Sequence, residues 1–197
     1  MSTIEQYANR TNSKLVFTSM IGYEAVTFAA FVTSFSQNFS SNWNTEVVYG
    51  RQDPIGTFQN TQRTISVGWD IPSGDVGIAK DNLMKVNNLI KMLYPAYSTG
   101  RAEAKGTTLG TNALSLAKSP LVKIKYANLI NNSSAGGGLL GWISSINWDP
   151  VVDMGMYAES GNLYPKVISL SVEFNVLHEN DLGKGSGGPP AKFPFGG

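Results

Sequence analysis

The sequence predicts a mainly β fold, a barrel or sandwich of about eight strands with one flanking amphipathic α-helix. Two observations lead to this prediction. Apolar and polar residues alternate with a period of two in several segments, which is typical of half-buried antiparallel strands. One other segment spaces its apolar residues by three and four, which is typical of a helix.

The clearest strand is predicted at 168–176, where apolar residues alternate strictly with Ser, Glu and Asn. A second strand is predicted at 63–71, and a long one over 24–35. Weaker alternation predicts further strands at 14–19, 39–48, 121–126, 140–148 and 154–158.

The helix is predicted at about 75–94, where apolar residues with 3-4-3-4-3 spacing form a single stripe. Ser73 is a suitable N-cap, and Asp75 suits the positive end of the helix dipole. Pro95 ends the helix. We expect this helix to pack on the sheet.

We expect a single β-barrel domain over 1–182. Within it, a long loop is predicted at 98–119, which is rich in Gly, Thr, Ala and Ser and has no strong period. The tail at 183–197 is rich in Gly and Pro and is expected to be flexible.

The composition excludes several classes of protein. Charged residues make up only 15% of the chain and the net charge is +1, so no basic surface for nucleic acid is indicated. Cysteine is absent, which excludes disulfides and thiolate zinc sites. The N-terminus lacks a signal-peptide pattern, and no apolar run approaches the roughly 18 residues that cross a membrane.

The sequence predicts no catalytic residue, cofactor site or metal site, and we expect no enzyme activity. His178 is the single histidine, so a Ser-His-Asp triad or a histidine metal site would have to use it. No GxSxG motif accompanies it, and the expected role is a strand-end histidine beside Glu179. The carboxylates are scattered, which gives a glycan hydrolase only weak support.

The four tryptophans leave a second function open. Trp69 alternates with apolar residues and is expected in the core. Trp142 and Trp148 have the same parity as Ile146 and are expected to share a buried face. If instead they are accessible, they suit stacking on sugar rings, as in a virion-associated carbohydrate- or peptidoglycan-binding module.

Most of the chain, about residues 33–182, resembles tail proteins of contractile-tailed bacteriophages. The resemblance is carried by YGRQDPIGTFQNTQRTISVGWDIPS, by the helix AKDNLMKVNNLIKMLYPAYS, by SPLVKIKYANLI and by LYPKVISLSVEFNVLHENDLG. Its most specific pieces are Gly50-Arg51, Asp53-Pro54, Phe58-Gln59, 63–65 and 177–179.

The resemblance implies a tail-tube-like fold and a structural virion protein at the junction of tail tube and baseplate, of the tube-initiator or baseplate-hub type. It implies a ring of identical subunits, commonly a hexamer, made and assembled in the bacterial host cytoplasm and retained in the virion tail. The implied partners are other tube and baseplate proteins, with the genome passing through the lumen and neither sequence-specific nucleic-acid binding nor a membrane involved. Tube proteins that line such a conduit often carry an acidic inner face, and no acidic strand face is evident in this sequence.

The segment around 47–73 supplies candidate residues for an assembly interface or for anchoring a loop. Pro54 fixes its own φ and restricts Asp53, while an arginine can bind a carboxylate or carbonyl groups through two donors. These residues either contact a neighbouring subunit, or include a buried arginine that holds the loop against its own barrel. The candidates are Tyr49, Arg51, Asp53, Pro54, Phe58 and Arg63.

Overall fold

The computed structural model describes residues 14–29, 31–99, 114–132, 137–179, 182 and 193. The described residues form a mainly β fold with one α-helix, which confirms the predicted class. A seven-stranded antiparallel sheet has the order β2-β1-β7-β8-β11-β4-β3. Its strands are β1 (Lys14–Ser19), β2 (Val26–Ala29), β3 (Phe31–Glu46), β4 (Ile55–Pro72), β7 (Val122–Tyr126), β8 (Leu139–Pro150) and β11 (Val167–Val176).

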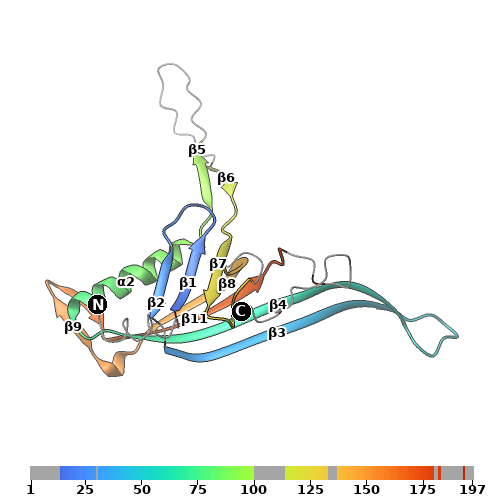
Figure 1. Cartoon of the computed structure of the whole chain (residues 1–197), viewed down its shortest axis with the longest axis horizontal. Helices are drawn as coiled ribbons and strands as arrows, with labels where there is room; N and C mark the ends of the chain where they lie inside the picture. The colour runs from blue at the N-terminus through green and yellow to red at the C-terminus, as the bar shows by residue number, and fades with distance from the viewer. Residues whose placement is uncertain are drawn as a thin grey trace, which may run out of the picture.

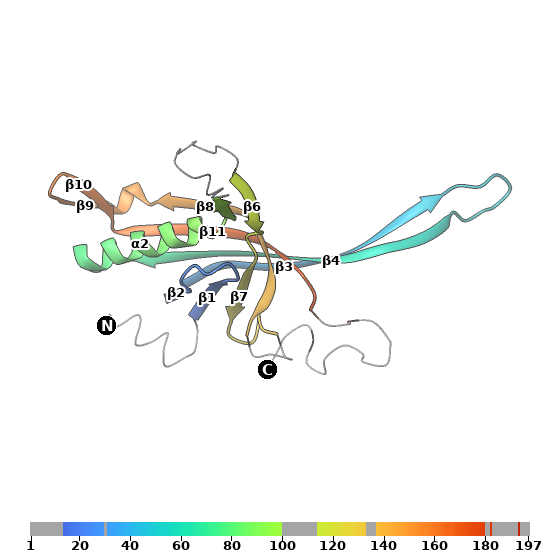
Figure 2. The ribbon, with the colours of Figure 1, turned by 90° about the horizontal axis from the view of Figure 1, so that it is seen from above.

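The sheet bends so that β1, β2 and β7 cross over the layer formed by β8, β11 and β4 (Figures 1 and 2). Phe28 of β2 lies with its ring centroid 5.5 Å from that of Trp69 of β4, although four other strands separate β2 from β4 in the sheet. Phe17 of β1 lies 5.9 Å from the same indole. Because β2 and β3 remain the two edges of this sheet, the described chain forms an open sandwich rather than a closed barrel.

The core is built by the alternating inward residues of 63–71 in β4 and of β11, the two segments where this alternation is predicted. Ile65, Val67 and Trp69 of β4 are buried opposite Phe174, Val172 and Leu170 of β11. Burial of such side chains contributes roughly 1.5–3 kcal/mol each, so this pair of strands contributes much of the stability of the fold.

The helix α2 (Val76–Lys91) covers one side of the sandwich, shorter at both ends than the predicted 75–94. Its N-cap is Asp75 rather than Ser73, since the Asp75 carboxylate accepts a hydrogen bond from Ile78 N at 2.8 Å. The Ser73 hydroxyl instead accepts a buried hydrogen bond from Asn82 at 3.0 Å. The helix buries Ala79, Asn82, Val86 and Leu89.

Several predicted segments differ from those observed. The strand expected at 24–35 is divided between β2 and β3, which pair with different partners, and β3 continues through most of 39–48. The loop expected at 98–119 begins and ends in a hairpin of β5 (Ala96–Thr99) and β6 (Leu114–Lys118), while 100–113 lies outside the described residues. A second hairpin joins β9 (Met156–Glu159) and β10 (Asn162–Pro165), after the 3-10 turn η1 (Val152–Met154).

Two further expectations concern parts of the chain that the structure describes only partly. The tail at 183–197 lies outside the described residues except for Phe193, and the domain limits stay a prediction. No helix in the described ranges is long and apolar enough to cross a membrane.

Trp142 and Trp148 do not share a buried face, because a β-bulge in β8 shifts the register opposite Glu173 and Phe174. Trp142 pairs with the outward Asn175, whereas Trp148 pairs with the inward Leu170. Both indoles are partly exposed.

Candidate assembly interface

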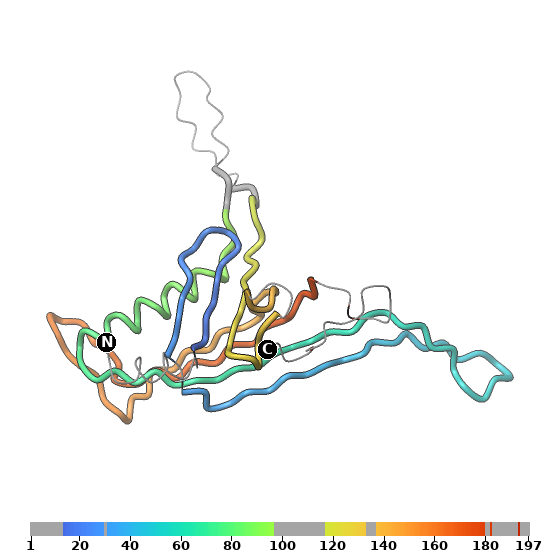
Figure 3. Tube along the Cα trace, viewed as in Figure 1, coloured from blue at the N-terminus to red at the C-terminus, as the bar shows by residue number. Residues whose placement is uncertain are grey.

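The most exposed element is a long hairpin arm, residues 40–62, formed by the distal parts of β3 and β4 (Figures 1 and 3). It projects away from the rest of the sheet, and every residue of β4 from Ile55 to Gln62 is exposed. The pairing nevertheless continues along the arm, from Ser40 opposite Gln62 to Glu46 opposite Ile55. The arm is therefore a two-stranded ribbon without a core of its own.

Cross-strand side chains hold the arm together. Trp43 and Phe58 form an edge-to-face pair with centroids 5.3 Å apart, and both rings remain about half exposed. The Asn42 amide donates a hydrogen bond to Asn60 Oδ1 at 2.7 Å. Such cross-strand pairs contribute roughly 0.2–1 kcal/mol each, which leaves an isolated ribbon of this kind only marginally stable in water.

The tip of the arm, residues 47–54, carries the most exposed aromatic side chain of the described chain. Arg51 N donates to Val48 O at 3.3 Å, closing a turn in which Gly50 has φ +85°, a conformation that favours glycine. This turn places Tyr49 fully in solvent, with a relative exposure of 103%. Asp53 and Pro54 lie after this turn, between it and the start of β4.

The root of the arm is formed by Arg63, which is only 1% exposed. Its Nε and Nη2 both donate to Gln37 Oε1, at 3.0 and 2.6 Å, and Gln37 Nε2 donates to Leu129 O at 3.2 Å. Arg63 also lies 5.2 Å from the ring centroid of Phe39. Burial lowers the pKa of Arg63 to about 10, so the side chain is still a cation at neutral pH.

The six candidate residues therefore separate into two groups. Arg63 is buried at the root of the arm, where it donates hydrogen bonds to Gln37 of the same chain. Tyr49, Arg51, Asp53 and Pro54 lie at the exposed tip, and Phe58 lies on the exposed ribbon. Arg51 and Asp53 make no ion pair within the described chain, and an intersubunit role for the exposed group stays a prediction.

A second feature is the outward face of the sheet, which we call the polar face. Register places four rows of residues across β3, β4, β11 and β8 on this side. Its charged members are carboxylates, and it contains no Lys or Arg in these rows. The positions are Phe31, Asp70, Ser169, Asp149; Ser34, Gly68, Ser171, Asn147; Ser36, Ser66, Glu173, Ser145; and Asn38, Thr64, Asn175, Trp142.

Hydrogen bonds tie the polar face into a continuous surface. Ser169 Oγ donates to Asp70 Oδ1 at 2.6 Å, and Thr64 Oγ1 donates to Asn175 Oδ1 at 3.2 Å. The sequence alone does not indicate an acidic face, because each strand supplies at most one carboxylate to it. The register brings Asp70, Asp149 and Glu173 together.

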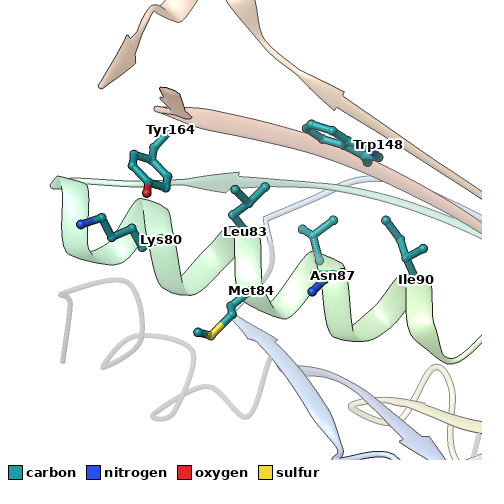
Figure 4. Close-up of a pocket in the computed structure, with 8 residues that line it drawn as sticks. Lys80, Leu83, Met84, Asn87, Ile90, Trp148 and Tyr164 are labelled. Atoms are coloured by element: carbon teal, nitrogen blue, oxygen red, sulfur yellow. The ribbon is translucent and has the colours of Figure 1, made fainter. Parts of the chain in front are cut away.

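A third feature is an open pocket of about 560 Å³ beside α2, between the helix, β8 and β10 (Figure 4). Leu83, Asn87 and Ile90 of the helix face Trp148 of β8 across it. Lys80 at one end lies 5.4 Å from the ring centroid of Tyr164 and forms an ion pair with Glu159. Leu83 and Ile90 belong to the apolar stripe of the helix; both are partly buried and line this pocket, and Ile90 also packs against the core.

Burial and the positive charge of Arg63 lower the pKa of His178. Next to it, Glu179 accepts hydrogen bonds from Lys123 and Asn132. Among the described residues, no three His, Cys, Asp or Glu side chains are placed to hold a metal ion.

Comparison with known proteins gave matches among solved structures alone. No family model matches the chain, and no curated protein matches it. Among solved structures, the chain is similar to a chain of the "Cryo-EM structure of the anti-feeding prophage (AFP) baseplate, 6-fold symmetrised". The alignment covers 84% of this chain and 88% of that chain, with a TM-score of 0.32 and 7% sequence identity.

Proposed function

We propose that this protein is a structural subunit of a contractile phage tail, and that it assembles through its arm into a ring at the tube–baseplate junction. The observation that supports this most directly is the arm itself. A two-stranded ribbon is marginal on its own, and this one exposes Trp43, Phe58 and Tyr49 instead of burying them. The proposal gives these aromatic side chains a surface on a neighbouring subunit and assigns no catalytic activity to the chain.

The position of the arm is suited to a ring. The arm lies at one end of an elongated chain, and when each arm contacts the body of the next copy these heterologous contacts close into a ring if the rotation is right. The edge of β3 supports the same proposal, since it ends the sheet and has no Pro, Lys or Arg along its 16 residues. Such an unprotected edge is suited to pairing with another strand. A hexamer is the symmetry that we propose.

We further propose that the polar face lines the lumen of this ring. Its hydroxyl and amide groups are well hydrated, and Asp70, Asp149 and Glu173 repel the phosphates of a passing genome. A surface without Lys or Arg offers no ion pair that would hold the nucleic acid.

The test is complementation of a phage that lacks this gene. Trp43→Ser combined with Phe58→Ser should leave a folded chain that fails to form rings in sedimentation experiments and gives defective tails in electron micrographs. Met84→Ser, at an equally exposed apolar residue on α2, should assemble normally. Purified tails that contain no copy of the protein would refute the proposal.

A second candidate function, a carbohydrate- or peptidoglycan-binding module of the same particle, is favoured by the pocket beside α2. Trp148 and Tyr164 present aromatic rings there, and Asn87 and Lys80 present polar groups. Cell-wall fragments should then change the tryptophan fluorescence of the wild type but not that of Trp148→Phe. Unchanged wild-type fluorescence would remove this candidate.

A further inference from the structure

A second exposed apolar surface lies at the end of the molecule opposite the arm. The β9–β10 hairpin and the turn η1 form this end, and the arm projects from the other (Figures 1 and 2). Val152, Met154 and Leu163 are each more than half exposed here. We call this surface the distal patch: Val152, Met154, Met156 and Leu163.

The two sides of the β9–β10 hairpin differ in what they contact. Tyr164 lines the pocket beside α2, and Tyr157, its partner in the register, donates a hydrogen bond to Ser73 O at 3.3 Å. Side chains alternate between the two sides of a strand, so Met156 and Leu163 lie on the opposite side, away from the helix. That side is both apolar and exposed, which is the character of an interaction surface.

Backbone hydrogen bonds fix the distal patch at the end of the sheet. Before η1, Val151 N donates to Val167 O at 3.1 Å. After η1, Lys166 N donates to Gly155 O at 3.3 Å. These bonds tie the turn to the start of β11, so the patch is a preformed surface that can hold a ribbon of marginal stability.

Charged groups on the distal patch and on the arm tip are complementary. Asp153 is exposed in the middle of η1. Lys166 Nζ lies 3.6 Å from the position that a Cβ on Gly155, the C-cap of η1, would take. Neither Asp153 nor Lys166 forms an ion pair with another described residue. The arm tip carries one opposite charge for each of them, Arg51 and Asp53.

We propose that the distal patch binds the arm tip of a second copy of this chain. Tyr49 of the tip lies on Met154 and Leu163 of the patch, because thioether and aliphatic side chains adapt well to an aromatic ring. Arg51 faces Asp153, and this pair of opposite charges fixes the orientation of the tip. The inference rests on the proposed function and names the surface that the arm contacts.

The placement of the two surfaces fits this contact. The tip and the patch lie at opposite ends of the elongated chain (Figure 2). Each copy can therefore give its arm to one neighbour and receive the arm of the other at the same time. This is the heterologous contact that a ring requires.

The absence of cysteine from the chain allows a specific cross-linking test. Tyr49→Cys combined with Leu163→Cys introduces two thiols at opposite ends of one chain, so mild oxidation joins them only between copies. Assembled rings should then give a ladder of disulfide-linked oligomers on a non-reducing gel. The matched control replaces Leu163→Cys by Met84→Cys on α2, where the exposure is 62% against 64% for Leu163, and should give no ladder.

The outcomes separate this inference from the proposed function. Rings that sediment normally without the ladder would overturn the docking and leave the patch to a different tail protein, while the ring itself would stand. An equally strong ladder in the control would also overturn the docking. A chain that forms no ring would refute the proposed function and this inference together.

A charge exchange tests the orientation of the tip. Arg51→Glu and Asp153→Lys each bring like charges together, and each should raise the concentration required for ring assembly roughly tenfold in sedimentation experiments. Their combination should restore assembly to within about twofold of the wild type. Arg51→Glu combined with Asp81→Lys, at an exposed residue of α2, should not restore it. If the two combinations assemble equally well, or if neither recovers, the pairing of Arg51 with Asp153 is wrong.

Discussion

The arm is joined to the body through Gln37, and we expect Gln37→Leu to lower the free energy of unfolding by about 3 kcal/mol. Gln37 accepts two hydrogen bonds from the buried Arg63 and donates one to Leu129 O. Hydrogen bonds to charged groups contribute roughly 1.5–3 kcal/mol and neutral ones about 1 kcal/mol. Because Gln37 is only partly buried, we take the low end for its two bonds to Arg63, about 3 kcal/mol together, and no net contribution from the bond to Leu129 O, which water can replace. The two hydrogen bonds to the buried cation are the larger part of the loss.

Urea unfolding followed by tryptophan fluorescence measures this change, because Trp69 is fully buried in the core. With a slope of about 2 kcal/mol/M, the midpoint should fall by about 1.5 M. Gln37→Glu keeps an acceptor oxygen beside the guanidinium and should retain most of the stability. Adding Arg63→Met to Gln37→Leu removes the buried charge and should recover at least about 1 kcal/mol.

The matched control is Gln62→Leu, which makes the same substitution at an exposed residue of the neighbouring strand. Its effect should stay within about 0.5 kcal/mol of the wild type. The reasoning is refuted if Gln37→Leu and Gln62→Leu unfold at the same urea concentration. In that case Arg63 is held by other contacts, and Gln37 does not anchor the arm.

Three further predictions concern pH, packing and charge. Burial and the guanidinium at the arm's root lower the pKa of His178, so the unfolded chain binds its proton more tightly and stability should decrease as pH falls below about 6.5. His178→Gln should reduce the change of the urea midpoint between pH 5 and pH 7. A pH dependence equal to that of the wild type would contradict this. A Cβ on Gly141 would overlap a backbone oxygen and an aromatic ring of β11. Gly141→Ala should therefore lower the free energy of unfolding by about 2 kcal/mol in urea. Gly74→Ala is the control and should leave it unchanged, because the space around Gly74 is open. Ser171→Lys places a cation on the polar face and should make assembled rings retain DNA at low salt, while Met84→Lys on the helix should not; equal retention would argue against a lumenal polar face.

Strands could be predicted from the sequence where one of their two sides is buried. The strand at 63–71 alternates clearly because one side packs in the core, as Trp69 does. The continuation of the same strand over 55–62 has no such period, because neither side of the arm is buried. Hydrophobic periodicity reports burial rather than strand geometry, so a ribbon without a core leaves no periodic signal.

The sequence does not distinguish which of the candidate residues are exposed and which are buried. Arg51 and Arg63 have the same chemistry in the sequence, and only tertiary packing makes one an exposed tip residue and the other a buried anchor. Trp142 and Trp148 show the second limit. A single bulge reverses the side on which one of them lies, and no residue in 142–148 marks its position unambiguously.

The low charge content of the chain has a structural counterpart in these surfaces. Only 15% of residues are charged, and the arm is among the parts of the chain with few charged residues. Between Phe31 and Gln62 the charged residues are Glu46 and two at the tip, Arg51 and Asp53. A free monomer would gain solubility from charges on such an exposed ribbon, and their absence lets the ribbon be covered without desolvating ions. The arm therefore combines two properties, marginal stability alone and a low cost of burial, and both favour a surface that becomes ordered against its neighbour during assembly.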